Sequence, residues 1–255
     1  MKFDMHCHTK EGSMDGKVPI DDFIAELIRK GFNGMLVSDH NSYNGYRTWK
    51  RNIKDQKFKD FVVLKGIEYD TIDAGHILVI MPETIKLKIL ELRGLPVQIL
   101  IDIVHKNGGI LGPAHPCGEK YLSFTNTLKK RNQMAVMNQF DFLEGFNESV
   151  ESNHCAKVLA EMYALPTFGG SDAHKTDCIG MAYTDIPEKI SCESDLIRAV
   201  KLGEGIKCGG SYYRGTTKEK IGKANNILVQ SFWFYNRLGS LYRHHRRKAE
   251  MHKMV

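Results

Sequence analysis

The chain has 255 residues, which suits one large domain or one domain with a small appendage. Hydrophobic residues make up 42% and charged residues 26%, a composition that excludes collagen-like, wholly disordered and disulfide-scaffold chains. The formal net charge of +6 is unevenly distributed, because residues 214–255 contain 10 basic and two acidic residues whereas residues 1–213 contain 26 basic and 28 acidic residues. A body of net charge −2 therefore precedes a tail of net charge +8, and the overall charge does not describe the body.

The sequence carries no sign of export or of a membrane anchor. The N-terminal segment MKFDMHCH has no apolar stretch after its charged residue, so we expect no signal peptide and a cytoplasmic location. No run approaches 18 apolar residues, so we expect no membrane span. The six cysteines are scattered without a CxxC pair, which predicts reduced thiols in that compartment.

Short apolar runs alternate along the chain with segments of helical periodicity. Strands are expected at 3–8, 34–40, 61–68, 76–81, 109–115, 141–147 and 166–170, with the third and fourth paired around a turn at 73–75. Helices are expected at 20–30, 46–56, 97–106, 153–164 and 194–202, and 122–138 is expected to be partly helical. This alternation predicts parallel strands joined by right-handed crossovers, and about seven such units favour a barrel over an open sheet.

Histidines gather where such a fold would place an active site. Six of the 11 histidines lie at or beside predicted strand ends, and acidic residues share these places; the histidines are His6, His8, His40, His76, His115 and His174, and the acidic residues are Asp15, Asp39, Glu68 and Asp172. The carboxyl ends of barrel strands form the active-site face, and two strand residues separated by one point to the same side. Independent structural histidines are the alternative, and the repetition at five strand ends argues against them.

Imidazole and carboxylate ligands together suit Zn²⁺, Mn²⁺ or Fe²⁺. About ten candidate ligands exceed what one ion needs, so we expect two or three divalent ions. Neighbouring ions generate hydroxide near neutral pH and hold both oxygens of an in-line displacement. Phosphate ester hydrolysis is the reaction that most needs this arrangement.

The ordered motifs MHCHT with a following Asp-Gly, SDH, GIE, GH, AHP and GSDAH resemble the PHP (polymerase and histidinol phosphatase) family across about residues 1–187. The resemblance implies a distorted (β/α)7 TIM-like barrel at 1–213 with a trinuclear metal centre, of the stand-alone phosphoesterase type, followed by a short basic, helical C-terminal extension at 214–255. It implies three ligand sets, which are His6, His8, Glu68 and Asp172; then Glu68 as a bridge with His76 and His115; and finally Asp15, His40 and His174. Asp15 follows His8 by seven residues, where the family often has five or six, so Glu11 remains an alternative.

The expected activity is hydrolysis of a phosphomonoester, a small phosphorylated metabolite or nucleotide, by a metal-bridging hydroxide. The resemblance and the ligand pattern assign catalytic roles to Glu68, Asp172 and His174. Cations and one amide near the motifs are the expected substrate-binding groups, and they are Lys10, Arg47, Asn147, Lys175 and Arg214. We expect Asp39 to orient His40, with an ordinary structural hydrogen bond as the alternative.

Other functions stay open at this point. The basic and aromatic tail can bind nucleic acid, which would suit a 5′–3′ exonuclease or a nucleoside 3′,5′-bisphosphate phosphatase, or it can pack on the barrel or lie at a membrane surface. An amidohydrolase-like metal hydrolase also begins with an HxH strand, and a non-catalytic metal-binding module is the remaining alternative. The sequence indicates no particular oligomeric state.

Overall fold

The computed structural model describes residues 1–52, 58–118, 122–128, 130–147, 150–203 and 205–212, together with Ser231, Phe234 and Leu238. Within these residues the strands are β1 (Lys2–Cys7), β2 (Gly34–Val37), β3 (Val62–Asp70), β4 (His76–Ile80), β5 (Ile110–Pro113), β6 (Leu143–Phe146), β7 (Thr167–Gly169), β8 (Ala182–Asp185) and β9 (Lys207–Gly210). The helices are α1 (Ile20–Arg29), α2 (Asn44–Asn52), α3 (Val97–Lys106), α4 (Phe124–Thr127), α5 (Lys130–Met137), α6 (Val150–Tyr163) and α7 (Glu193–Leu202), with 3₁₀ turns η2 (Lys88–Glu91) and η3 (Thr176–Cys178).

The strands form a mixed sheet and a separate pair. Seven strands pair in the order β5-β4-β3-β2-β1-β8-β9, and β6 pairs with β7 alone. The β1–β2, β2–β3 and β6–β7 pairs are parallel, as predicted, whereas β3–β4, β4–β5, β1–β8 and β8–β9 are antiparallel. The parallel pairing expected from the alternation is therefore found only in part, and the expected pairing of the third and fourth strands around the turn at 73–75 is observed as the antiparallel β3–β4 pair. Only residues 71–75 join β3 to β4, which is too short for the crossover that a parallel pair needs.

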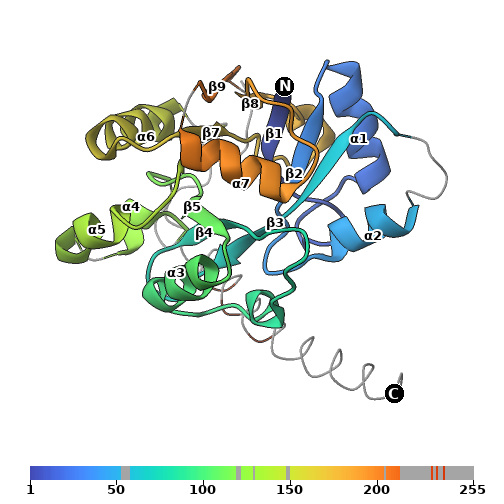
Figure 1. Cartoon of the computed structure of the whole chain (residues 1–255). Coiled ribbons are helices and arrows are strands. Elements are labelled where there is room, and N and C mark those ends of the chain that lie inside the picture. Colours follow the sequence, from blue (N-terminus) through green and yellow to red (C-terminus); the bar gives the residue numbers. More distant parts are fainter. Residues whose placement is uncertain are drawn as a thin grey trace.

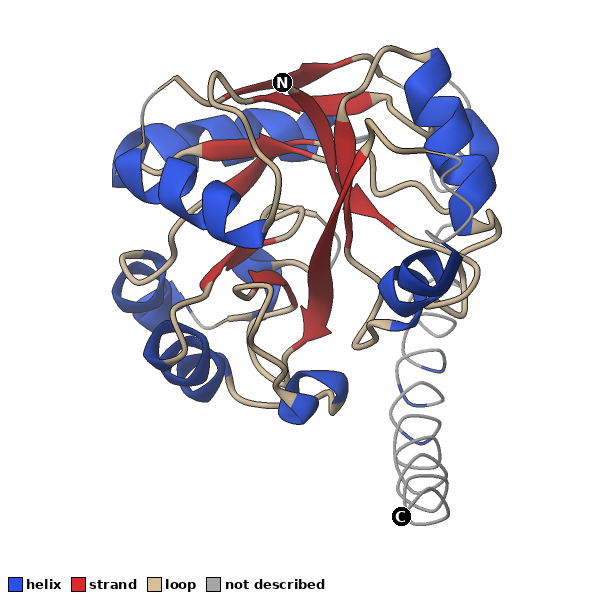
Figure 2. Cartoon of the chain, turned by 45° about the vertical axis from the view of Figure 1, so that its right-hand side comes forward, coloured by secondary structure: helices blue, strands red, loops and turns tan. Residues whose placement is uncertain are grey.

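The large sheet curls, and the small sheet lies across its open side. Strands occupy the centre of the molecule with helices around them (Figure 1, Figure 2). On one side the Asp141 N–H donates to the Leu111 carbonyl at 2.9 Å, and on the other the Gly169 N–H donates to Thr184 Oγ1 at 2.8 Å. The described strands thus form a half-barrel with a strand pair beside it, in place of the closed (β/α)7 ring that we expected.

Apolar side chains at helical spacing fix the helices to the sheet. The buried positions of α1 are Ile20, Phe23, Ile24 and Leu27, and those of α3 are Val97, Leu100, Ile101 and Val104. Both sets follow the i, i+3, i+4, i+7 pattern of a single helix face. Burial of each such side chain stabilises the fold by about 1.5–3 kcal/mol, so the strands between these helices are held firmly.

The strand directions bring the predicted motifs to one edge of the sheet. The carboxyl ends of parallel β1, β2 and β3 lie together, and antiparallel β4 begins at the edge where they end. This explains why His76 stands at the start of its strand whereas His8 and His40 follow the ends of theirs. Residues 214–255, including Arg214, lie outside the described residues except for three positions, so the division at residue 213 stays a prediction. In the described part of the chain, no helix combines the length and the apolarity needed to cross a membrane.

Candidate metal centre

The structure brings all nine predicted metal ligands together. They fall into overlapping groups whose ligand atoms lie within 4.8 Å of one another. The groups are His8, Asp15, His40 and His174; His6, His8, Glu68 and Asp172; Glu68, His76 and His115; and His40, Asp70 and His76. The first three contain the ligand sets that the family resemblance implies, and the fourth introduces Asp70, which the sequence analysis did not select.

The two histidines of β1 present their Nε2 atoms to a common point. His6 Nε2 and His8 Nε2 lie 3.0 Å apart. His6 Nδ1 lies 2.9 Å from Glu144 Oε1, a carboxylate that can only accept, and His8 Nδ1 lies 3.0 Å from the Ser13 hydroxyl, which donates to Asp39. These partners assign the ring protons to the two Nδ1 atoms, so both Nε2 lone pairs face inward, as they do in metal sites.

Glu68 connects two of the groups through its two oxygens. Oε2 lies 3.4 Å from His6 Nε2 and 3.2 Å from His8 Nε2. Oε1 lies 2.9 Å from His76 Nδ1 and 3.0 Å from His115 Nε2. Because Glu68 is fully buried, this geometry suits a carboxylate that bridges two cations.

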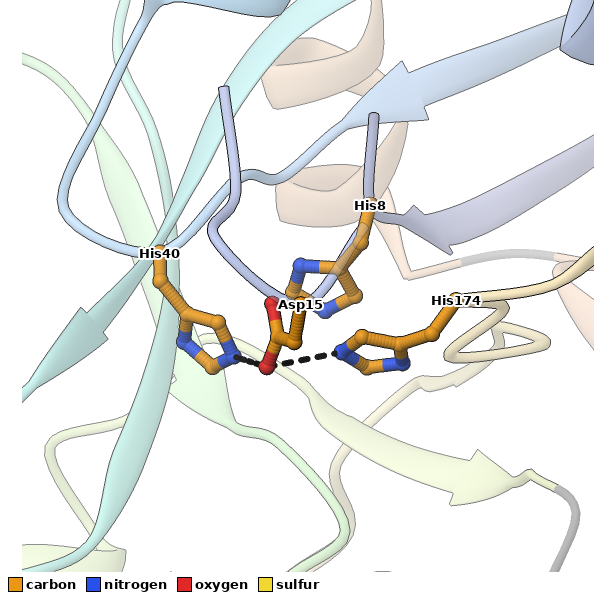
Figure 3. A group of neighbouring side chains, drawn as sticks. All are labelled: His8, Asp15, His40 and His174. Atoms are coloured by element: carbon orange, nitrogen blue, oxygen red, sulfur yellow. Dashed lines mark ion pairs between the residues drawn. The ribbon is translucent and has the colours of Figure 1, made fainter. Parts of the chain in front are cut away.

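The remaining group surrounds Asp15 (Figure 3). Asp15 Oδ2 lies 3.6 Å from His40 Nε2 and 3.3 Å from His174 Nε2. His174 Nδ1 donates to the Asp172 carbonyl at 2.8 Å, which leaves its Nε2 to face Asp15. The alternative carboxylate, Glu11, instead accepts the backbone N–H of Ile20 at the start of α1. The structure thus places Asp15 in the group and Glu11 outside it.

Several buried polar atoms of the cluster have no hydrogen-bond partner. Among the described residues these atoms are Asp15 Oδ1, His40 Nδ1, Glu68 Oε2, Asp70 Oδ1, Thr127 Oγ1 and Ser152 Oγ. Four of the six belong to the cluster. A buried polar atom without a partner costs about 1–3 kcal/mol, so a concentration of them beside inward-facing imidazoles needs compensation. Divalent cations supply it, and the residues present fit such ions.

Opposite charges in the cluster shift the pKa values of its members strongly. Burial lowers the pKa of His6, but the carboxylates of Glu144, Glu68 and Asp172 outweigh burial and hold this pKa well above its ordinary value. Burial raises the pKa of Glu68, but the neighbouring rings of His76, His40 and His6 hold it well below its usual range. Protons therefore occupy the same nitrogen atoms that cations would occupy, and the two compete.

Three strand-end residues beside the cluster adopt backbone conformations that side chains disfavour. The φ angles are 46° at Asn41, 28° at His115 and 50° at Asp172. The Asn41 N–H donates to the Glu68 carbonyl at 3.0 Å, and the Asp172 N–H donates to the His6 carbonyl at 2.9 Å. Strained positions persist only where their surroundings fix them, and they concentrate at functional sites.

Comparison with known proteins finds one partial family match and several proteins of similar fold. A family model described as PHP-associated matches residues 150–204. PsfC from Pseudomonas syringae PB-5123 has a similar structure, with a TM-score of 0.62 at 16% sequence identity over 93% of this chain and 98% of that chain. A two-domain protein from Bacteroides vulgatus, which contains a predicted PHP-like metal-dependent phosphoesterase, has a TM-score of 0.60 at 16% identity over 83% of this chain and 65% of that chain. The family model thus covers the segment from α6 to α7, and the two structural neighbours share the fold of this chain.

One further structural neighbour is described as an amidohydrolase. An amidohydrolase from Chromobacterium violaceum, with bound sulfate and no metal, is similar to this chain with a TM-score of 0.56 at 12% identity, over 78% of this chain and 96% of that chain. No curated protein is similar enough to match the chain. At such identities the structural likeness establishes the fold and leaves the substrate to be argued from the site.

Two residues behind the ligand cluster were missed or given another role by the sequence analysis. Glu144 was not selected, yet its Oε1 contacts His6 Nδ1 and its Oε2 accepts the His115 N–H at 2.5 Å. Asp39 accepts the Thr9 N–H at 2.6 Å and the Ser13 hydroxyl at 3.1 Å. Asp39 therefore acts on His8 through Ser13, and its expected contact with the His40 ring is replaced by this relay. Alternation along the strand at 141–147 was the available signal for Glu144.

The expected substrate-binding residues divide into separate places. Lys10 and Lys175 are exposed on the loops that follow β1 and β7, directly beyond His8 and His174. Asn147 is buried, and its side-chain amide donates to Glu144 Oε2 at 3.4 Å, so it lies behind the cluster.

Arg47 is engaged elsewhere, because its guanidinium donates twice to Glu91 at 2.7 Å. Arg214 falls outside the described residues.

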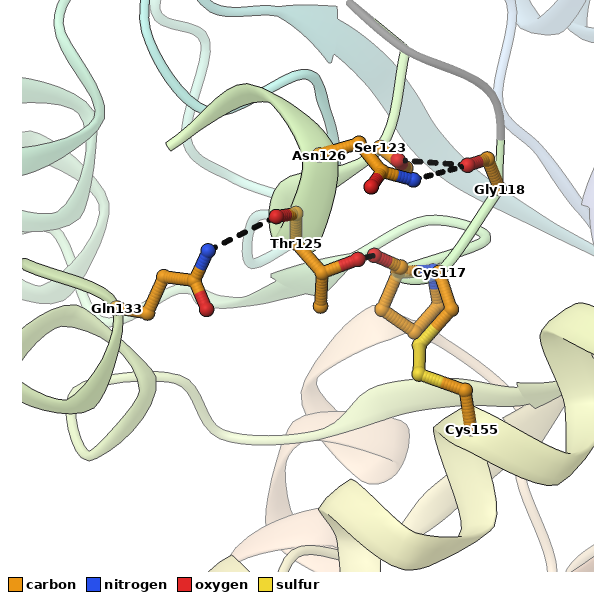
Figure 4. The surroundings of a disulfide bond; sticks show 8 residues. Cys117, Gly118, Ser123, Thr125, Asn126, Gln133 and Cys155 are labelled. Carbon is orange, nitrogen blue, oxygen red and sulfur yellow. Dashed lines mark hydrogen bonds between the residues drawn. A yellow bond between two sulfur atoms is a disulfide. The ribbon is translucent and has the colours of Figure 1, made fainter. Parts of the chain in front are cut away.

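The expectation of six reduced cysteines is wrong for one pair. Cys117 and Cys155 form a disulfide with a Cα–Cα distance of 6.0 Å (Figure 4). Cys7, Cys178, Cys192 and Cys208 form no disulfide. The fold places the loop after β5 against α6, although 38 residues separate the two cysteines. Because His115 lies two residues before Cys117, the bond ties a candidate ligand loop to a helix. The adjacent Pro116 carbonyl accepts two hydrogen bonds from Thr125 at 2.9 Å.

Proposed function

We propose that the protein is a metal-dependent phosphoesterase that hydrolyses a phosphomonoester, a small phosphorylated metabolite or a nucleotide, with two or three divalent cations. One observation carries this proposal: imidazole and carboxylate atoms converge on the two oxygens of buried Glu68. Histidine with carboxylate ligands favours Zn²⁺, Mn²⁺ or Fe²⁺. Such ions, when bound, lower the pKa of water and neutralise charge on phosphate oxygens.

The residues at the solvent side of the cluster suit contact with substrate. Glu68 is fully buried, whereas the side chains of Asp172 and His174 are 12% and 24% exposed. We assign Glu68 to holding the cations and Asp172 and His174 to the face that meets the phosphoester. Lys10 and Lys175 flank this face on their loops and can donate charge-assisted hydrogen bonds to phosphate oxygens.

The fold likeness supports a distorted TIM-like barrel of the PHP type as the scaffold, and the name of the Bacteroides vulgatus neighbour supports phosphoester hydrolysis. The Chromobacterium violaceum amidohydrolase fits C–N bond hydrolysis as the alternative. Amidohydrolase barrels often hold their metals with a bridging lysine, whereas here the carboxylate of Glu68 lies between two of the ligand groups. This composition favours the phosphoesterase.

Metal analysis and a substrate screen test the proposal. Protein purified without chelator is expected to contain two or three equivalents of divalent metal and to release phosphate from sugar phosphates, nucleotides or p-nitrophenyl phosphate. His8→Ala should lose metal and more than about 100-fold of the activity, since even residues behind ligands contribute about 10–100-fold. His105→Ala is the matched control, because His105 contacts Asp141 on the outside of the fold and lies outside the four groups.

Two results would refute the phosphoesterase. One is a wild-type protein that binds no metal under any preparation while His8→Ala hydrolyses phosphoesters at the wild-type rate. The other is turnover of amide or amidine substrates with no phosphate release across the screen, which would establish the C–N hydrolase.

The charge of +8 in residues 214–255 supports a second candidate, a 5′–3′ exonuclease or nucleoside 3′,5′-bisphosphate phosphatase with the same metal centre. If the tail binds nucleic acid, truncation after Tyr213 should weaken oligonucleotide turnover more than turnover of p-nitrophenyl phosphate. Equal losses for both substrates would leave the small phosphomonoester as the substrate class.

A further inference from the structure

Asp70 is a buried carboxylate that the ligand sets of the sequence analysis did not include. It ends β3 two residues after Glu68, so the two side chains share a face of the strand, and it lies directly opposite His76 in the β3–β4 register. Its N–H donates to Asn41 Oδ1 at 3.0 Å, and its carbonyl accepts the Gly94 N–H at 2.8 Å. The backbone thus fixes the point from which the carboxylate projects.

The two oxygens of Asp70 face different partners. Oδ1 lies 3.4 Å from His40 Nδ1 and 3.3 Å from His76 Nε2, is buried, and has no hydrogen-bond partner. Oδ2 contacts the guanidinium of Arg93, and the side chains of Asp70 and Arg93 are only 5% and 8% exposed. Oδ2 is therefore held by the guanidinium of Arg93, and Oδ1 is available to the two imidazole rings.

Each of these rings turns its other nitrogen toward a different ligand group. His76 Nδ1 lies 2.9 Å from Glu68 Oε1, which also contacts His115. His40 Nε2 lies 3.6 Å from Asp15 Oδ2. The nitrogen that remains on each ring is the one beside Asp70 Oδ1, although His40 Nδ1 also lies 3.1 Å from Glu68 Oε2. A single oxygen thus lies behind ligands of two separate groups.

We propose that Asp70 is a positioning residue of the metal centre, which accepts the outer ring N–H of both His40 and His76. Acceptance fixes the tautomers that leave His40 Nε2 and His76 Nδ1 free for cations, and it couples the group around Asp15 to the group around Glu68 and His115. Arg93 holds Asp70 in place. This inference rests on the metal site of the proposed function. A carboxylate behind an imidazole ligand typically contributes about 10–100-fold to metal affinity.

Direct ligation of an additional cation by Asp70 is the competing explanation for the fourth group. The Arg93 guanidinium beside Asp70 opposes it, because a second positive charge would then lie next to the first. The two explanations differ in stoichiometry. Loss of a positioning residue weakens binding and leaves the number of ions at saturation unchanged, whereas loss of a direct ligand lowers that number by one.

Titration of metal-free protein with Co²⁺, followed by its visible absorption, tests the proposal. In Asp70→Ala we expect about 10–100-fold weaker binding, an altered absorption spectrum and unchanged stoichiometry at saturation. Asp73→Asn is the matched control, because Asp73 lies three residues away and accepts the Val97 N–H at 2.9 Å at the start of α3. This control should bind Co²⁺ like the wild type.

The double variant Asp70→Ala/Arg93→Met separates positioning from simple charge neutralisation. It removes both members of the Asp70–Arg93 ion pair, so it should be thermally more stable than Asp70→Ala without regaining Co²⁺ affinity. Wild-type affinity in either variant, or the loss of one equivalent of Co²⁺ at saturation, would overturn the positioning role. A wild-type protein that binds no Co²⁺ would refute the proposed metal site itself, which distinguishes the two failures.

Discussion

Two buried glutamates, Glu68 in β3 and Glu193 beside Lys65 of the same strand, have opposite surroundings. Glu193, which begins α7, is 2% exposed and accepts the Lys65 N–H at 2.6 Å. Glu68 is fully buried, and the side chains around it are imidazoles and a further carboxylate that all present lone pairs or shared protons. A carboxylate that supports the fold lies beside a donor supplied by the chain. A carboxylate surrounded by other metal-binding groups instead faces imidazoles whose protons a cation can displace, and this difference separates a structural residue from a ligand.

The largest expected effect comes from removing the carboxylate charge of Glu68, compared with the same substitution at Glu193. Glu68→Gln should lose at least one bound ion and more than about 100-fold of phosphatase activity, because it removes the bridge between two ligand groups. Glu193→Gln should keep the wild-type metal content, since the new amide oxygen still accepts the Lys65 N–H. Metal analysis and phosphate release on both variants check this. Equal metal loss in the two variants would contradict the distinction.

The sequence predicts the part of the fold that depends on local patterns. The buried faces of α1 and α3 follow from helical periodicity, and β1, β2 and β3 pair in parallel as the alternation of elements indicates. β8 and β9 were not predicted, because YTD and KCGG are short and partly polar or glycine-rich. They become strands by pairing with a neighbour, which a local pattern does not reveal.

Within the site, the sequence predicts the candidate ligands in the motifs but not the residues that contact those ligands from behind. The nine expected ligands stand at strand ends and come together once the strands align. Asp70 and Glu144 were missed because the strand face alone does not show which ring a carboxylate will contact. The Arg47 pair with Glu91 and the Cys117–Cys155 bond join residues distant in sequence, so both depend on tertiary packing that no motif records.

The surroundings of Glu144 are intermediate between those of Glu68 and Glu193, and we expect its substitution to have an effect of intermediate size on metal binding. It accepts the His115 N–H and also contacts His6 Nδ1, so it has donors from the chain and lies directly behind a candidate ligand. Glu144→Gln should weaken metal binding by about 10–100-fold, because the amide has one acceptor oxygen where the carboxylate has two, so either the His6 ring or the His115 N–H loses its acceptor. Isothermal titration with Zn²⁺ measures this effect. Exposed Glu161 on α6 provides the matched Glu161→Gln control, and equal affinities in the two variants would reduce Glu144 to a backbone contact.

The smallest expected effect concerns how the contribution of Glu193 to the free energy of unfolding depends on pH. Burial raises the pKa of Glu193, and the hydrogen bond from the Lys65 N–H and the charge of Lys65 offset this only in part. Above the unfolded pKa of about 4.3, the folded state therefore keeps a proton that the unfolded state has lost. Because the folded state binds more protons in this window, the contribution of Glu193 to stability falls as pH rises through it toward the folded pKa. Glu193→Gln cannot titrate, so the free energy of unfolding of the variant relative to the wild type should rise over the same window. Urea unfolding at a series of pH values in the presence of chelator measures the difference, and a pH-independent difference would mean that this glutamate is no less ionised when folded than when unfolded.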